Sequence, residues 1–226
     1  AHVESRTRYG GMENVSAIFY NEQDYQKQRL SEGVVAHETA HQWFGDAVTE
    51  GDWHHLWLSE GFATYFSALW EGHAAGDSAF QRAMHAAATS VFDVTDSSGT
   101  HPNPVTERPV IDPAATDLMG LLNTNNYPKG AWVLHQLRGL IGDSAFFRGV
   151  RAYYADYRNR NALSSDFAGE MSKAAGIDLG WYCRQALTQS GYPVLDVRWS
   201  WAGRLLSLVV RQTQRSEWGE YRRAGL

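Results

Sequence analysis

The spacing of hydrophobic and polar residues divides the chain into an extended beginning, a long helical middle and an extended end. Strand-forming residues predominate over 3–20, where Gly10 and Gly11 interrupt them. From there to about residue 190, apolar residues recur mostly at helical spacing. The pattern predicts helices over 31–44, 56–70, 77–92, 128–141, 143–157, 165–175 and 178–190.

Residues that commonly begin or end helices support these limits. The predicted N-caps are Ser31, Asp77, Asp143, Ser164 and Asp178, and Gly45 is the predicted stop of the first helix. Four prolines fall within 93–117, which predicts a long irregular link between the third and fourth helices.

The pattern changes after Pro193. Residues 194–199 partly alternate, 205–212 are rich in β-formers, and Ala202-Gly203 between them reads as a hairpin turn. Because a lone hairpin is marginal in water, we interpret 192–226 as the first strands of a truncated β domain. The preceding residues, 1–191, then form the first domain.

Composition narrows the class of protein. The chain has 226 residues, 43% of them hydrophobic, which is enough to form a buried core without the help of disulfide bonds or structural metal ions. A net charge of -5 without a basic run argues against binding to nucleic acid, and no apolar run approaches the ~20 residues of a membrane span. The single cysteine, Cys183, excludes an intramolecular disulfide and a cysteine-only zinc site. Nothing in the sequence indicates a compartment.

The strongest chemical signal is the run His37-Glu38-Thr39-Ala40-His41. On a helix, positions i and i+4 share a face, so both imidazoles can reach one metal ion. Imidazole nitrogen suits Zn²⁺, and a catalytic zinc takes three protein ligands and a water. Glu38 lies between the histidines and can take a proton from that water and pass it to a leaving amine.

The third ligand could come from either of two patterns. An extended motif with a third histidine would need glycine at 44 and histidine at 47, where the chain has Phe44 and Ala47. Glu60 lies 19 residues after His41, early in the second predicted helix, and an antiparallel return would bring it beside the histidines. Two histidines and a glutamate form the ligand set of thermolysin-like peptidases.

Two further motifs extend this pattern. Gly10-Gly11-Met12-Glu13-Asn14 precedes His37 by 23 residues, and Tyr127-Pro128-Lys129-Gly130-Ala131 follows downstream. With the zinc motif, the chain resembles the M1 family of zinc aminopeptidases over nearly its whole length. The resemblance implies an α+β fold, with a thermolysin-like, mainly helical catalytic domain that has a short N-terminal β part and is followed by the first strands of a β-sandwich.

The resemblance also implies roles for individual residues. One Zn²⁺ per chain would be bound by His37, His41 and Glu60, with Glu38 as general base. Glu13 would bind the free α-amino group of a peptide substrate, since a carboxylate near the metal can distinguish a chain end from a chain middle. Tyr127 would stabilise the tetrahedral intermediate. The strand that docks the peptide would be shaped by Gly11, Met12 and Asn14.

The family ordinarily has a large domain before this region and further domains after it. The resemblance therefore implies that upstream and downstream domains of the parent chain are missing. Besides peptide hydrolysis by a zinc-activated water, two alternatives stay open: a related branch that opens lipid epoxides, and a non-catalytic peptide-binding remnant.

Lys129 is interpreted as a solvated residue at a helix start. Eight aromatic residues are predicted to form the core around the zinc helices: Trp43, Phe44, Trp53, Trp57, Phe62, Tyr65, Phe66 and Trp70.

Overall fold

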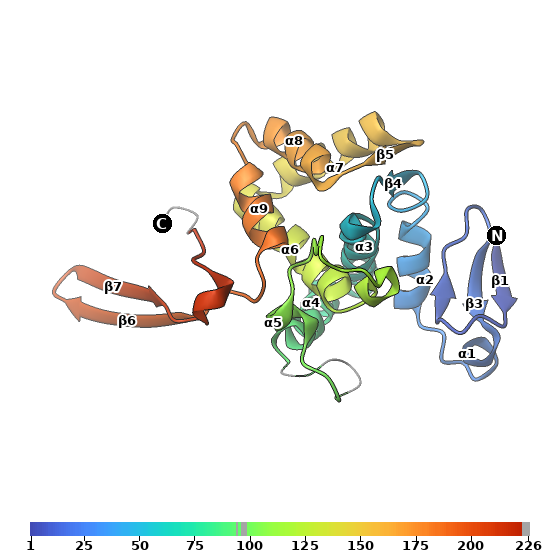
Figure 1. Ribbon diagram of the computed structural model, residues 1–226, viewed down its shortest axis with the longest axis horizontal. Helices are drawn as coiled ribbons and strands as arrows, with labels where there is room; N and C mark the ends of the chain where they lie inside the picture. The colour runs from blue at the N-terminus through green and yellow to red at the C-terminus, as the bar shows by residue number, and fades with distance from the viewer. Residues whose placement is uncertain (94, 96–98, 223–226) are drawn as a thin grey trace.

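The computed structural model describes residues 1–93, 95 and 99–222. Figure 1 shows a central group of helices, a small sheet at the N-terminal side and a two-stranded hairpin that projects from the other side. The predicted α+β class with a mainly helical body is confirmed. In the described part of the chain, no helix is both long enough and apolar enough to cross a membrane.

The extended beginning of the chain folds into a three-stranded sheet with the strand order β1-β3-β2. Its strands are β1 (His2–Ser5), β2 (Gly11–Met12) and β3 (Ile18–Asn21). β3 pairs in parallel with β1 and antiparallel with β2. Asn21 then caps the short helix α1 (Glu22–Gln26) by accepting backbone hydrogen bonds through its side chain. The sheet places β2 in contact with the helix that follows α1 in the chain, α2 (Glu32–Ala40).

Helix α2 (Glu32–Ala40) carries the predicted zinc motif. It begins at the predicted N-cap, Ser31, which accepts a hydrogen bond from Val34 N at 3.2 Å. The helix ends four residues before the predicted limit, because the following backbone groups bond across a tight turn in which Gly45 N donates to Val48 O at 2.9 Å. The chain continues into β4 (Val48–Glu50), which pairs in parallel with the distant strand β5 (Arg160–Ala162).

Helix α3 (Trp57–Ala75) follows a single turn of 3₁₀ helix, η1 (Trp53–His55). It continues past Gly72, where a Cβ would approach Phe80 Cβ to 2.9 Å, so the glycine permits close packing against α4 (Asp77–Phe92). Asp77 is the first residue of α4 and makes no capping hydrogen bond, so its prediction as N-cap is wrong.

Four further helices lie close to the predicted limits: α6 (Gly130–Ile141), α7 (Asp143–Tyr157), α8 (Ser164–Ala175) and α9 (Gly180–Thr188). The short helix α5 (Pro104–Glu107) lies within the segment predicted to be irregular, and η2 (Leu118–Leu121) and the π-helical turn η3 (Asn125–Lys129) come before α6. Asp178 accepts a hydrogen bond from Gly180 N at 2.8 Å but lies one residue before the N-cap of α9, Leu179. Asp143 and Ser164 are the first residues of their helices, so the three predicted N-caps are wrong by one residue. Residues 94 and 96–98 of the predicted link lie outside the described residues.

The predicted hairpin is present as β6 (Leu195–Ala202) and β7 (Leu205–Gln212), paired antiparallel. Its turn is Gly203-Arg204, one residue later than predicted, with Gly203 at a φ of +62°. A last short helix, η4 (Ser216–Trp218), returns to the helical body, where Trp218 Nε1 donates to Thr106 O at 3.0 Å.

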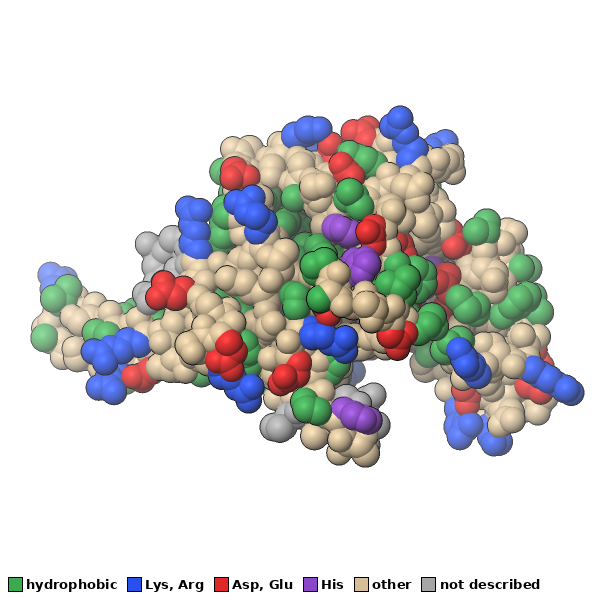
Figure 2. Space-filling view, viewed as in Figure 1, with side chains coloured by type: hydrophobic (Ala, Val, Ile, Leu, Met, Phe, Trp, Pro, Cys, Tyr) green, Lys and Arg blue, Asp and Glu red, His purple; other side chains and the backbone are tan. Residues whose placement is uncertain are grey.

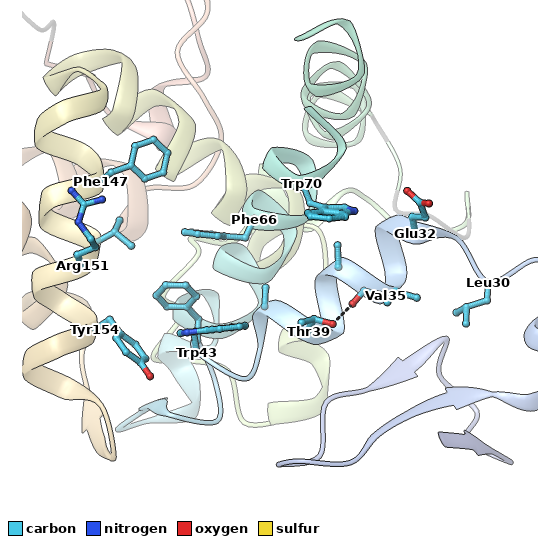
Figure 3. A pocket seen from close by; sticks show the side chains of 14 residues that line it. Leu30, Glu32, Val35, Thr39, Trp43, Phe66, Trp70, Phe147, Arg151 and Tyr154 are labelled. Atoms are coloured by element: carbon cyan, nitrogen blue, oxygen red, sulfur yellow. Dashed lines mark hydrogen bonds between the residues drawn. The ribbon is translucent and has the colours of Figure 1, made fainter. Parts of the chain in front are cut away.

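The hydrophobic core lies among α3, α6, α7 and α8. Of the eight aromatic residues predicted to build it, Phe44, Trp57, Phe62 and Tyr65 are buried, and Phe66 packs at its edge. Trp43, Trp53 and Trp70 are 48%, 39% and 47% exposed, so their prediction as core residues is wrong. Two of them, Trp43 and Trp70, instead line an apolar groove of about 830 Å³ between α2, α3 and α7 (Figure 3).

Candidate metal centre

Helices α2 and α3 bring the three predicted metal ligands to one point. His37 Nε2 and His41 Nε2 lie 3.1 Å apart, and Glu60 Oε2 lies 3.2 Å from the first and 3.3 Å from the second. A tetrahedral Zn²⁺ with bonds of about 2.0–2.1 Å to each ligand would separate its ligand atoms by about 3.3 Å. In the described part of the chain, this is the one group of His, Cys, Asp and Glu side chains that could hold a metal ion. The donor set and its spacing fit zinc.

The His41 ring is oriented by groups on its other side. Its Nδ1 donates to Phe44 O at 3.0 Å and lies 3.1 Å from Ser59 Oγ. This hydrogen bond fixes a proton on Nδ1, so Nε2 is the nitrogen that would bind a metal ion once it has lost its own proton. A Cβ on Gly45 would lie 2.5 Å from Ser59 Oγ, so glycine at this position allows the Ser59 hydroxyl to lie beside His41.

The ligand cluster strongly perturbs the protonation of its members. Burial disfavours the charged form of His41, but the hydrogen bond and charge of the Glu60 carboxylate outweigh burial and raise the His41 pKa to about 9. Burial opposes the charge of Glu60 as well, yet the hydrogen bonds from His37 and His41 lower the pKa of Glu60 to about 2. The site therefore keeps a carboxylate ionised in a buried position.

Glu38 lies beside the ligands, buried between α2 and β2. Burial is the main cause that raises the pKa of its carboxyl to about 7; the charges of Glu13 and Glu60 add to it, and that of His41 opposes it. A Cβ on Gly11 would overlap the Glu38 side chain, whereas a Cβ on Gly10 would meet no atom within 4 Å. The carboxyl group therefore occupies space that only glycine leaves free.

Tyr127 faces the same cluster from η3. Its ring stacks on that of His37, with centroids 6.0 Å apart and an angle of 10° between the planes. Burial, the Glu60 charge and a hydrogen bond to that carboxylate all raise the Tyr127 pKa, so the phenol keeps its proton. A Cβ on Gly61 would meet Gly130 Cα at 2.9 Å, and this close approach of α3 and α6 brings Tyr127 beside Glu60.

The predicted substrate-binding residues flank the cluster on the side of the sheet. Gly11 and Met12 form β2 and pair with Tyr20 and Phe19 of β3. Glu13 is half-buried in the loop after β2, and Asn14 is exposed. The Glu13 charge contributes to the raised pKa values of Glu38, His41 and Tyr127, which places its carboxylate within electrostatic range of all three. The structure thus brings every predicted site residue except Met12 and Asn14 into or against one half-buried cluster.

Sequence reasoning missed Gln42, which attaches the Glu13 loop to the end of α2. Its Nε2 donates to Glu13 O at 2.8 Å and to Asp46 Oδ2 at 2.6 Å, and its Oε1 accepts from Ser16 N at 3.1 Å. The available signal was its position directly after the second histidine, with an amide that both donates and accepts. Gln42 therefore sets where Glu13 stands relative to the ligands.

Two hollows lie on different faces of α2. One, of about 500 Å³, is lined by His37 and Glu38 and by small side chains of α3, α4 and α6, so it adjoins the ligand cluster. The other is the apolar groove of Figure 3, lined by α2 residues that include Val35 and Thr39.

Figure 2 shows histidine and acidic side chains gathered near the middle of one face of the molecule, with hydrophobic side chains around them and basic ones mainly toward the edges.

Comparisons with known proteins agree with this geometry. Residues 3–185 match the family model described as the Peptidase family M1 domain. The chain is 36% identical over 201 residues to a "Probable aminopeptidase 2" of Sulfurisphaera tokodaii, covering 84% of this chain and 25% of that protein. It is 37% identical over 210 residues to a leucyl aminopeptidase of Saccharolobus solfataricus, covering 88% and 26%.

Solved structures give the same result. A substituted form of the M1 zinc metallopeptidase of Deinococcus radiodurans, bound to a Tyr-Ser-Ala substrate, matches with a TM-score of 0.69 and 25% identity over 85% of this chain and 40% of that one. An aminopeptidase A of Legionella pneumophila matches in fold with a TM-score of 0.72 at 22% identity, over 94% and 24% of the two chains. The chain spans about a quarter of the length of the curated relatives. By motif order, ligand geometry and these matches, the chain belongs to peptidase family M1.

Proposed function

We propose that this chain is the catalytic portion of a zinc aminopeptidase, which removes the N-terminal residue of peptides. The single observation that carries the proposal is the convergence of His37, His41 and Glu60 with Glu38 beside them, inside a half-buried cluster that also faces Glu13 and Tyr127. The matched relatives named as aminopeptidases support the same class of reaction.

The ligand cluster would hold one Zn²⁺ through two imidazole nitrogens and one carboxylate oxygen. When bound there, zinc lowers the pKa of water and polarises a carbonyl oxygen. Two devices of the chain prepare the ligands for it. The Nδ1 hydrogen bond of His41 turns Nε2 toward His37 and Glu60, and the low pKa of Glu60 keeps that carboxylate negative.

Glu38 is proposed to be the general base. A pKa of about 7 lets its carboxylate accept a proton from the attacking water near neutral pH and then donate it to the leaving amine. Its position against Gly11 keeps it between β2 and the ligands, where a peptide lying along the strand would present its first peptide bond.

Tyr127 is proposed to donate a hydrogen bond to the oxygen of the scissile carbonyl as negative charge develops there. Its raised pKa ensures that the phenol retains the proton it must donate. Glu13 is proposed to pair with the α-ammonium group of the substrate, with Gly11, Met12 and Asn14 forming the docking edge. A peptide with a blocked N-terminus lacks the charge that Glu13 requires and should bind poorly.

The division of the chain is proposed as well. Residues 1–191 would be the catalytic domain, and 192–226 would begin a β-sandwich. The projecting hairpin, whose strands expose side chains on both faces, supports this division because such a surface is ordinarily covered in a complete domain.

The test is the release of fluorophore from aminoacyl coumarin amides by the zinc-loaded chain. Glu38→Gln keeps the size of the side chain and removes its basicity, so turnover should fall at least about a hundredfold while zinc remains bound. Glu217→Gln, at an exposed position of η4 outside the hollow beside Glu38, is the matched control and should keep full turnover.

Three outcomes separate the candidate activities. Equal turnover in wild type and Glu38→Gln would contradict the proposed mechanism. Stoichiometric binding of free-amine amides without turnover in the full-length parent protein would favour the peptide-binding remnant. Hydrolysis of an aliphatic epoxide in place of the amides would favour the epoxide-opening branch.

A further inference from the structure

Lys129 is not the solvated residue that the sequence suggested. The chain has only three lysines, and Lys27 and Lys173 are exposed, whereas Lys129 is 7% exposed beneath the junction of η3 and α6. An ammonium group is strongly hydrated, so burying it has a large free-energy cost unless an anion or several acceptors replace water.

The contacts of Lys129 replace little of that water. Its Nζ donates to Gln189 O at 3.4 Å, and among the residues that the structure describes no carboxylate forms an ion pair with it. Burial lowers the pKa of the amine to about 8, so most of the population still carries a positive charge at neutral pH. Lys129 is thus a buried cation with spare hydrogen-bond donors.

A second donor lies beside it. Trp132 follows Lys129 by three residues, which places both side chains on one helical face. Its indole Nε1 is buried and has no hydrogen-bond acceptor in the described part of the chain. Both residues line the same cavity of about 280 Å³, where α4, α6 and α9 meet next to the start of the hairpin (Figure 1).

The other walls of this cavity are largely apolar. They include Val91, Phe92, Val133, Ala186, Tyr192 and Pro193, and two polar side chains, Gln136 and Tyr221, also line the cavity. The cavity therefore combines one positive charge and one neutral N–H on a single face with hydrocarbon and aromatic surface opposite. It lies apart from the hollow beside Glu38, because the two hollows share no lining residue.

We propose that this cavity binds a small monocarboxylate that carries an aromatic or aliphatic group. A carboxylate presents one charge and two acceptor oxygens, which match one ammonium and one indole N–H. A phosphate dianion would bring a second negative charge, and Lys129 is the one cationic side chain among the lining residues. The aromatic or aliphatic group of the ligand would pack against the apolar side chains of the opposite wall.

This site should discriminate against free amino acids. An α-ammonium group next to the carboxylate would lie close to the Lys129 charge and would find no described carboxylate among the lining residues. The ligand is therefore distinct in chemistry from the products expected at the zinc site, and the inference does not depend on the proposed peptidase activity.

The experiment titrates the purified chain with 3-phenylpropionate and follows binding by calorimetry and by the indole N–H resonance of Trp132, assigned with Trp132→Phe. We expect saturable one-site binding and a downfield shift of that resonance. The matched probe 3-phenylpropanamide, with the same body and no charge, should bind at least about tenfold more weakly. Phenylalanine, which adds the ammonium, should also bind at least about tenfold more weakly.

Lys129→Met keeps the length and apolar stem of the side chain, so it should fold and should remove the preference for acid over amide. Lys27→Met, at an exposed position, should leave binding unchanged. Equal affinity for acid and amide in the wild type, or an unchanged acid preference in Lys129→Met, would overturn the proposal. So would the absence of saturable binding up to the solubility of the probe. If Lys129→Met did not fold, the acid-against-amide comparison in the wild type would decide alone.

Discussion

The α2–α3 pair and the β6–β7 hairpin contain hydrogen bonds of similar regularity, yet they differ in what surrounds them. In the helix pair, Trp57 and Phe62 are fully buried, and polar side chains such as His41 are buried as well. In the hairpin, eight residue pairs are in register, but Trp199 and Trp201 are 70% and 63% exposed. Backbone pairing alone thus does not create a buried site; packing on a core does.

The difference explains where chemistry is placed. A buried carboxylate or imidazole has its pKa shifted by burial and by its neighbours, as Glu38, His41 and Glu60 do. In the hairpin, by contrast, Arg198 pairs with Asp196 at 3.2 Å on the surface, and its side chain is 72% exposed. Substitutions in the helix pair should therefore affect metal binding and reactivity, while substitutions in the hairpin should affect neither.

The largest effect is expected from Glu60→Gln, which removes the one negative ligand. An amide oxygen is a much weaker ligand than a carboxylate, so the affinity for Zn²⁺ should fall by at least about a hundredfold. Competition with a chromophoric chelator measures this directly. Glu71→Gln on the same helix should bind zinc as wild type does, and equal affinity of the two variants would refute the assignment of Glu60 as a ligand.

The next largest effect is a loss of turnover in Gly11→Ala, for which Gly10→Ala is the control. A methyl group at 11 would overlap Glu38, whereas at 10 it would meet open space. The Glu38 carboxylate must move aside, and a displacement of about 1 Å in a reacting group reduces turnover by up to about a hundredfold. Aminoacyl amide hydrolysis should fall at least about tenfold in Gly11→Ala alone, with zinc affinity unchanged.

Two results would contradict the prediction for this pair of variants. If both alanine variants lost turnover to the same degree, the effect would come from the loop and not from the contact with Glu38. If neither lost turnover, the Glu38 carboxylate would tolerate displacement without loss of its function.

A smaller effect is expected from pH. In the metal-free chain the His41 pKa is raised to about 9, so at neutral pH this residue holds a proton that Zn²⁺ must displace. Zinc affinity should therefore rise with pH by up to about tenfold per unit until about pH 9 and then level off. Uptake near pH 7.5 should release about one proton, which a weakly buffered indicator solution would detect.

The matched variant for this prediction is Ser59→Ala. It removes a hydroxyl near Nδ1 of His41 and leaves the Glu60 contact intact, so the pH dependence should keep its slope. A zinc affinity that did not change between about pH 6 and about pH 9 would show that His41 is already neutral in the metal-free protein.

The contrast between helix pair and hairpin also shows what sequence can and cannot predict. Spacing on a helix is local, so His37, Glu38 and His41 could be assigned to one face from the sequence alone. Glu60 required only that α3 return antiparallel to α2, which the intervening 18 residues allow. The hairpin was predicted for an equally local reason, the alternation of side chains around a glycine turn.

What could not be predicted depends on contacts between distant segments. The early end of α2 reflects hydrogen bonds across the turn to β4, and Gln42 acquires its role only because the Glu13 loop lies against it. Lys129 looked like a surface residue because helix starts are often solvated, yet α9 and the segment after it cover it. Trp43, in the turn after α2, and Trp70, on α3, line a groove instead of the core.

The smallest effect is expected from Trp199→Thr in β6. Threonine keeps a high strand propensity, and the indole is mostly exposed, so its removal takes away little buried surface. The free energy of unfolding should change by less than about 0.5 kcal/mol, and zinc affinity should not change. Urea denaturation followed by circular dichroism measures the first and chelator competition the second. The matched change in the helix pair, Phe62→Ala, should cost about 3–5 kcal/mol, because it empties a fully buried position. A loss of similar size in Trp199→Thr would mean that the hairpin strands are packed in solution against a surface of the protein, and the contrast between the two regions would then disappear.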